Sequence, residues 1–170
     1  QYLAATDQVP SNHKLLSFNA TLLADEVGRN ASQMVLARRV YDHVLASVEP
    51  VPESSSGAVE AYRAGEGSAR AYADLYAAML RSQGIPARRH GGLLVLDSAT
   101  AVEHFWVEFF LIGFGWFPAD PAIGDGMYQQ QTAALTRFYG EELRETAFGS
   151  LDSRRATLAD DGAEPTRRYP

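Results

Sequence analysis

The periodicity of apolar residues changes near the middle of the chain, and this change constrains the fold more than any other feature. Residues 69–82 carry apolar side chains at helical spacing, whereas residues 88–98 and 102–111 have the composition of strands. Gly84 and Pro86 mark the boundary, because glycine suits a helix C-terminus and proline prevents its continuation. Residues 112–115, "IGFG", predict a turn into another strand. Since helices come first and strands follow in a meander, we expect an α+β fold with helices packed on an antiparallel β-sheet.

The flanking segments complete this predicted order. Residues 31–48 form an amphipathic pattern that predicts a helix, with Asn30 as its N-cap. The first 30 residues predict a loop and a short helix, and residues 147–162 predict one or two short strands within a polar C-terminal region. A chain of 170 residues is long enough for one domain with a sizeable core. We therefore expect a single domain over residues 1–170.

Composition excludes several classes of protein. The chain has no cysteine, which excludes disulfides, thiolate metal sites and a cysteine nucleophile. Its 15 basic and 21 acidic residues give a net charge of −6, which argues against binding to nucleic acid or to acidic membranes. Four scattered arginine pairs are interpreted as solvated surface: Arg38-Arg39, Arg88-Arg89, Arg154-Arg155 and Arg167-Arg168.

Localisation stays open at this level. No apolar run approaches the roughly 18 residues that a membrane-spanning helix needs, and no signal peptide is recognised. Because the chain opens on Gln1 rather than Met, we expect that a preceding segment was removed or left out. Both a cytoplasmic and a periplasmic location are compatible with the sequence.

The entry into the predicted helix at residues 69–82 has the form of a reactive site. Ser68 is a good N-cap, and Gly65 and Gly67 allow a sharp approach of the chain. Helix N-termini favour anions and thiolates, because their N–H groups are unpaired and the helix dipole is positive there. The first residue after the cap is Ala69, however, and its methyl group can do no chemistry.

The predicted hairpin at residues 102–121 carries a candidate acid–base pair. Side chains alternate along a strand, so His104, Trp106 and Glu108 share one face. A turn at residues 112–115 predicts that Asp120 lies nearly opposite His104 on the next strand. An aspartate that accepts a hydrogen bond from one ring nitrogen of a histidine fixes its tautomer and leaves the other nitrogen free as a base.

Simpler interpretations of these residues also stand. A lone histidine on a half-buried strand is commonly a hydrogen-bonded core residue, and Asp120 followed by Pro121 is a common start of a turn. A metal site built from His104 and Glu108 fails on geometry. Four residues along a strand span roughly 13 Å, which is too far for two ligands of one ion.

Several of these segments together resemble the transglutaminase-like domains of the papain-like thiol superfamily. The matching segments are "GSARAYADLYAAMLRSQGIPARRHGG" (67–92), "EHFWVEFFLIGFGWFPADPAIG" (103–124) and "FGSLDSRR" (148–155). The family pattern has Gly-x-Cys at a helix start, Gly-Ile-Pro-Ala-Arg after that helix, His-x-Trp-x-Glu on a strand, and Asp-Pro after the next strand. Each piece occurs here in the same order, which makes the resemblance specific.

The resemblance implies a catalytic triad whose nucleophile is missing. By position, Ala69 stands where the family has its nucleophilic Cys, His104 is the base and Asp120 orients that base. Ala71, where the family often has an acidic residue, is a second departure. The implied chemistry is thiol attack on the amide or ester carbonyl of a peptide, protein or small substrate, without metal or cofactor. The aromatic side chains of Tyr62, Trp106 and Trp116 are candidates for the walls of the substrate site.

The alanine itself admits several interpretations. Ala69 is either an engineered replacement of Cys in an active enzyme or a natural residue of a pseudoenzyme that binds a peptide or amide-bearing ligand. Ser68 as a substitute nucleophile is disfavoured, because a shift of one residue turns a helical side chain by about 100°. A non-catalytic binding or structural domain that keeps the His104–Asp120 pair only for packing is a further alternative.

Overall fold

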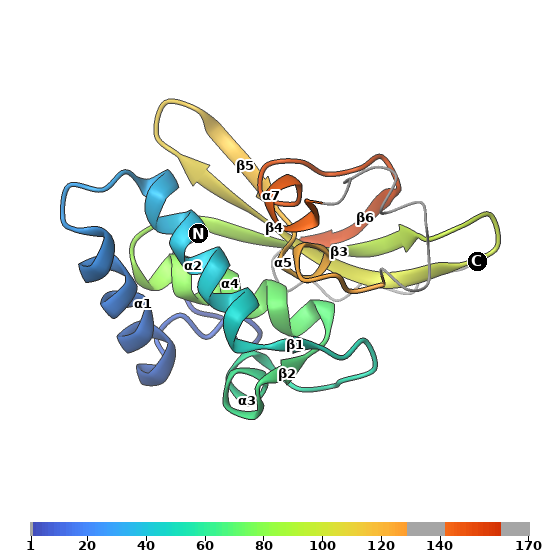
Figure 1. Ribbon diagram of the computed structural model, residues 1–170, viewed down its shortest axis with the longest axis horizontal. Coiled ribbons are helices and arrows are strands. Elements are labelled where there is room, and N and C mark those ends of the chain that lie inside the picture. Colours follow the sequence, from blue (N-terminus) through green and yellow to red (C-terminus); the bar gives the residue numbers. More distant parts are fainter. Residues whose placement is uncertain (1, 129–141, 161–170) are drawn as a thin grey trace.

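The computed structural model describes residues 2–128 and 142–160. Helices form one layer and an antiparallel sheet forms the other, as the sequence predicts (Figure 1). The helices are α1 (Lys14–Val27), α2 (Gln33–Ser47), α3 (Ala58–Ala64), α4 (Ala69–Ser82), α5 (Pro121–Gly124) and α7 (Leu143–Thr146). The main strands are β3 (Ala87–Val95), β4 (Ala101–Leu111), β5 (Gly115–Ala119) and β6 (Arg155–Asp160).

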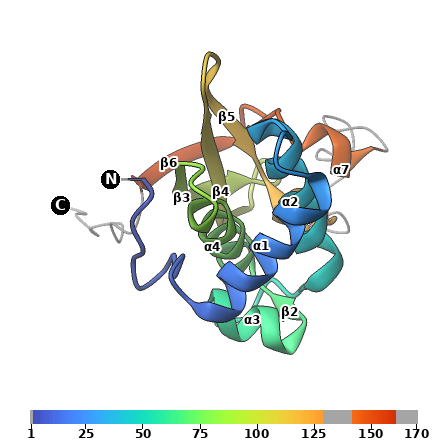
Figure 2. The same ribbon diagram turned by 90° about the vertical axis from the view of Figure 1, so that its left-hand side faces the viewer.

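Helix α4 occupies the centre of the molecule. Figure 2 shows it between the sheet and the α1–α2 pair. Twelve of its residues are buried, from Ala69 to Arg81 with the exception of Arg70. Apolar side chains cover most of its surface, which is typical of a helix in a core, and the small side chains of Ala73, Ala77 and Ala78 allow close packing there. This burial fixes the direction in which the N-terminus of α4 points.

The helix boundaries differ from the prediction in two places. Helix α2 begins after Ser32, not after Asn30, because the Ser32 hydroxyl accepts a hydrogen bond from the Val35 backbone N–H at 3.3 Å. Helix α3 and a short parallel pair, β1 (Glu49–Pro50) with β2 (Glu66–Gly67), were not predicted. These elements are too short to produce a periodic signal, and Gly65 closes α3 at φ 77°.

The sheet has the strand order β5-β4-β3-β6, and all its neighbours are antiparallel. Strand β6 comes from the C-terminal region and pairs with β3. The sequence predicts one or two short strands in residues 147–162, and the structure has one among the residues it describes, at residues 155–160. Gly92 permits this pairing. A Cβ at Gly92 would lie 1.9 Å from the Ala156 carbonyl oxygen, so only glycine allows β6 to approach. Gly92 also faces His104 on β4.

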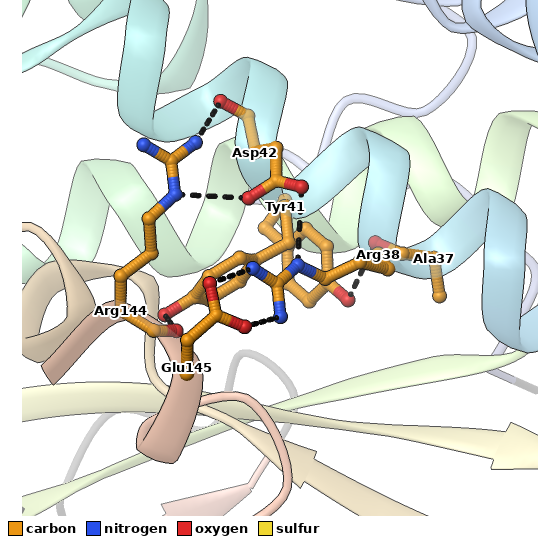
Figure 3. A network of polar contacts seen from close by, with 7 residues as sticks. Ala37, Arg38, Tyr41, Asp42, Arg144 and Glu145 are labelled. Atoms are coloured by element: carbon orange, nitrogen blue, oxygen red, sulfur yellow. Dashed lines mark hydrogen bonds and ion pairs between the residues drawn. The ribbon is translucent and has the colours of Figure 1, made fainter. Parts of the chain in front are cut away.

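Hydrogen bonds and ion pairs connect helix α7 to helix α2 (Figure 3). Helix α7 comes before β6 in the chain. The Arg38 guanidinium donates to both oxygens of Glu145, at 2.5 and 2.6 Å. Arg144 Nε donates to Asp42 at 3.0 Å, and the Tyr41 hydroxyl donates to the Arg144 carbonyl at 3.1 Å. The network holds the chain beside the sheet before it enters β6. Within the described ranges, no helix is both long and apolar enough to cross a membrane.

Candidate active site

The structure brings His104 and Asp120 into direct contact. The ring of His104, on β4, bonds through Nε2 to Asp120 Oδ2 at 2.7 Å, and both side chains are fully buried. Asp120 is the N-cap of α5, with Pro121 at the first helical position, and its Oδ1 accepts from the Ile123 backbone N–H at 3.0 Å. The Asp-Pro segment is therefore a helix start, and the cap leaves the second carboxylate oxygen for the histidine.

The cross-strand register differs slightly from the prediction. Val107 faces Ala119, so Asp120 lies one residue beyond the last β4–β5 pair and reaches His104 along a diagonal. The two residues are not opposite each other in the ladder. The contact forms nevertheless: Asp120 is the N-cap of α5, its Oδ1 is bonded to the Ile123 backbone N–H, and its Oδ2 contacts His104.

Asp120 also forms an ion pair with Arg155, which the sequence analysis did not predict. Arg155 Nη2 donates to Asp120 Oδ2 at 2.5 Å, and Arg155 Nη1 donates to Asp152. Burial by itself raises the pKa of Asp120, but the charges of His104 and Arg155 and the hydrogen bonds from His104 and Ile123 outweigh it and lower the pKa to about 2. Asp120 is thus an ionised carboxylate at neutral pH.

The interpretation of the arginine pairs as solvated surface is wrong at two positions. Arg155 is buried at the candidate site, and Arg89 is buried against Asp74 of α4 at 3.3 Å. The pair at residues 167–168 lies outside the described residues. A signal for Arg155 existed in the sequence, since it belongs to the "FGSLDSRR" segment, but its partner Asp120 is 35 residues away.

Ala69 is the first residue of α4 and lies in the wall of a cavity of about 330 Å³. The Ser68 side chain makes no capping hydrogen bond, so capping does not account for it as predicted. The lining is rich in hydroxyl groups and consists of Pro52, Ser54, Ser55, Ser56, Ser68, Ala69, Arg70, Glu103, Phe105 and Tyr128. The N-terminus of α4 therefore opens onto a space at the lower end of the volumes that small-molecule sites have.

Tyr128 joins the cavity to the His104–Asp120 pair. Glu103 and Phe105, the two chain neighbours of His104, line the cavity, although alternation along β4 turns their side chains to the opposite sheet face from the imidazole. Tyr128 also lines it and packs edge-on against the imidazole, with ring centroids 5.7 Å apart. His104 Nδ1 is buried and has no hydrogen-bond partner among the described residues. One ring nitrogen is thus committed to Asp120 and the other is left as an unpaired polar atom.

The aromatic residues that line the cavity are not those that the sequence suggested. Trp106 is buried and stacks on His104 and on His90, with ring centroids 6.3 and 5.6 Å away, and Trp116 packs against Tyr2 and Phe110. Tyr62 bonds to His43. Phe105 and Tyr128 supply the cavity wall, because the alternation along β4 turns Trp106 to the opposite sheet face from Phe105.

Glu108 has a structural role on the Trp106 face of the sheet. Its Oε2 accepts from Arg88 Nε at 2.8 Å and lies 2.8 Å from His90 Nε2. Among the described residues, no three His, Asp or Glu side chains gather in a way that could hold a metal ion.

Residues 22–121, more than half of the chain, match the family model of the transglutaminase-like superfamily. The chain belongs to the transglutaminase-like superfamily. No curated protein matches it. Similar solved structures support the same fold: a putative cysteine protease from Cytophaga hutchinsonii has 18% identity and a TM-score of 0.58 over 94% of this chain and 52% of its own.

The periplasmic domain of TgpA from Pseudomonas aeruginosa gives a comparable match. It has 22% identity and a TM-score of 0.56, over 85% of this chain and 50% of its own. The same domain bound to ethylmercury also has 22% identity, with a TM-score of 0.54 over 78% of this chain and 49% of its own. This transglutaminase-like chain thus spans about half the length of these solved proteins. It also lacks the cysteine on which a cysteine protease depends.

Proposed function

We propose that this transglutaminase-like chain carries a site for cysteine-protease or amide acyl-transfer chemistry whose nucleophile is replaced by Ala69. In this proposal the chain is inactive as it stands, and its cavity binds a peptide, protein segment or amide-bearing small molecule. One observation carries the proposal. His104 is hydrogen-bonded to Asp120 through Nε2 and keeps Nδ1 unpaired, beside a cavity that exposes the N-terminus of α4.

The missing step follows from the chemistry of residue 69. A cysteine there would give its proton to the imidazole, and the N-terminal N–H groups of α4 would stabilise the thiolate. The thiolate would attack the carbonyl carbon, the leaving amine would take a proton from the imidazolium, and water or a second amine would release the acyl group. The alanine methyl group supplies neither a nucleophile nor a charge, so no thioacyl intermediate can form.

Restoring the thiol tests the proposal directly. Because the chain has no other cysteine, Ala69→Cys introduces a single thiol whose alkylation by iodoacetamide can be followed without interference. An ordinary cysteine is only a few per cent thiolate at pH 7, so a depressed pKa would speed alkylation about tenfold. A rate equal to that of free cysteine would show that the site is wrongly assigned.

Two further variants separate the roles of burial and of His104. Ala58→Cys is the matched control, because Ala58 is also the first residue of a helix, is also 3% exposed, and belongs to α3, which packs on α4 and β2. His104→Gln in the Ala69→Cys protein should return alkylation to the rate of the control. If His104→Gln has no effect while the protein stays folded, the histidine is only a core residue.

A non-catalytic peptide- or protein-binding domain is the second candidate. The departure at Ala71, in addition to Ala69, and the absence of any cysteine favour a natural origin of the alanine. Intact His104, Trp106 and Asp120 favour an engineered replacement. The codon at position 69 in the parent gene separates these origins, since a cysteine codon identifies an engineered enzyme and an alanine codon a natural pseudoenzyme.

A further inference from the structure

Strand β6 and the segment just before it bring a second charged pair, Arg155 and Asp152, to His104 and Asp120. The order of contacts is Asp152, Arg155, Asp120 and His104, and each is joined to the next by a hydrogen bond or ion pair. The four side chains are between 0 and 4% exposed. Charges buried to this degree are stable only when they are paired, so the sum of charges in this chain of contacts matters.

Arg155 and His104 share one oxygen of Asp120. Both donate to Oδ2, while Oδ1 is occupied by the Ile123 backbone N–H. When the imidazole is neutral, Arg155 is the only full positive charge in contact with Asp120 among the described residues. Without Arg155, a buried carboxylate would face a neutral ring, and binding a further proton would be the least costly way to balance the charge.

Arg155 is itself held in a fixed position. Asp152 accepts from its Nη1 and also accepts the Arg154 backbone N–H at 2.8 Å. The Arg155 guanidinium lies over Trp106, with Cζ 5.7 Å from the ring centroid, and Trp106 in turn stacks on His104. The guanidinium therefore cannot move away from Asp120 without losing contacts on two further sides.

We propose that Arg155 is a positioning residue that balances the charge of Asp120, so that the His104–Asp120 pair holds a single proton on Nε2 and leaves Nδ1 as an acceptor. The inference rests on the proposed role of His104 as a base. A proton on Nδ1 would block that role, because this nitrogen would then have no lone pair to receive the proton of a nucleophile.

In the described part of the chain, the other titratable groups around the pair do not change this balance at neutral pH. Burial raises the pKa of Tyr128, which packs on the imidazole, to about 12. Burial also raises the pKa of Tyr41, which lies within the field of Asp120. Both phenols are thus uncharged at pH 7. Glu103 neighbours His104 in the chain, is exposed, and lies 3.7 Å from Arg70. Within residues 2–128 and 142–160, the buried charges joined to His104 by direct contacts are those of Asp120, Arg155 and Asp152.

The test uses the chain as it is, with Ala69 in place and ¹⁵N-labelled histidine. Long-range ¹H–¹⁵N spectra report which ring nitrogen of each of the four histidines is protonated. At pH 7 we expect the parent protein to show His104 protonated on Nε2 alone. In Arg155→Met, proton uptake by the His104–Asp120 pair should move to higher pH by roughly one to three units, the size of shift that a contacting charge produces.

Conservative and neighbouring variants separate charge from mere packing. Arg155→Lys keeps the charge and should keep the parent spectrum of His104. Arg154→Met should also leave it unchanged, because Arg154 donates to the Leu96 carbonyl at 3.1 Å and not to Asp120. The signals of His13, His43 and His90 report whether each variant is folded. An Arg155→Met protein that is folded and has the parent spectrum of His104 would overturn the inference.

A variant that removes a negative charge instead of a positive one keeps the inference testable if Arg155→Met does not fold. Asp152→Asn removes a negative charge with little change of shape, so proton uptake by the pair should move to lower pH. No shift, or a shift to higher pH, would contradict the inference. Since these spectra need no thiol, they can succeed or fail independently of the alkylation test at position 69.

Discussion

Replacing Asp125 with asparagine should stabilise the protein, and only above mildly acidic pH. Asp125 follows α5 and accepts a hydrogen bond from the Tyr72 hydroxyl of α4, which also contacts the Val48 carbonyl. Burial raises the pKa of Asp125 to about 6, although the Tyr72 hydrogen bond acts in the opposite direction. The carboxylate is thus held where its charged form is disfavoured, five residues after Asp120 in the sequence.

The sign of the effect follows from proton linkage. With a folded-state pKa of about 6 and an unfolded value of about 3.9, the folded protein binds more protons than the unfolded chain between these pH values. The free energy of unfolding therefore falls as pH rises through this window, and the loss is complete above about pH 6. Two pKa units correspond to about 3 kcal/mol, and solvent screening of this partly exposed carboxyl reduces the expected effect to about 1 to 2 kcal/mol.

Urea unfolding at pH 4.5 and pH 8 measures this effect. The advantage of Asp125→Asn over the parent should grow by about 1 to 2 kcal/mol from the lower to the higher pH, with equal m-values. Any pH-independent change in the Tyr72 hydrogen bond cancels in this comparison. Asp25→Asn, at an exposed position of α1, serves as the control and should show no such growth. An advantage of the same size at both pH values would refute the reasoning.

Two further predictions concern the packing around the site. Gly124→Ala would place a Cβ 1.8 Å from the Tyr41 hydroxyl oxygen, so it should destabilise the protein by about 1 to 3 kcal/mol in urea unfolding, and Tyr41→Phe in the same protein should recover part of the loss. Recovery of nothing would mean that the clash is not the cause. Asp74→Ala leaves Arg89 buried without this ion pair and should cost about 3 to 5 kcal/mol, whereas Asp74→Leu with Arg89→Met should cost clearly less.

The sequence predicted the main elements well, because their signals are local. Helix α4 begins after Ser68 and ends before Gly84, which adopts φ 75°, and the strands of the hairpin lie where apolar and aromatic residues indicate. Capping preferences, glycine conformations and side-chain periodicity act over a few residues and can be recognised without the rest of the chain. The short elements α3, β1 and β2 lack this signal, since they depend on packing against α4 and against one another.

The candidate site could be predicted only in part from the sequence. The pairing of His104 with Asp120 followed from their places on a hairpin, although the register was shifted and the contact is diagonal. Arg155 was predicted to lie on the surface, because an arginine in a polar segment carries no sign of its future partner. Its burial depends on β6 pairing with β3, a contact between segments about 60 residues apart.

The sequence by itself determined the order of helices and strands, the hairpin that carries His104 and Asp120, and the alanine at the N-terminus of α4. The tertiary structure alone decided that Arg155 and Asp152 join this pair and that Phe105 and Tyr128, not the tryptophans, face the cavity. The physical reason is that the state of a buried charge is set by every charge around it, and those neighbours come from segments that meet only in the folded chain.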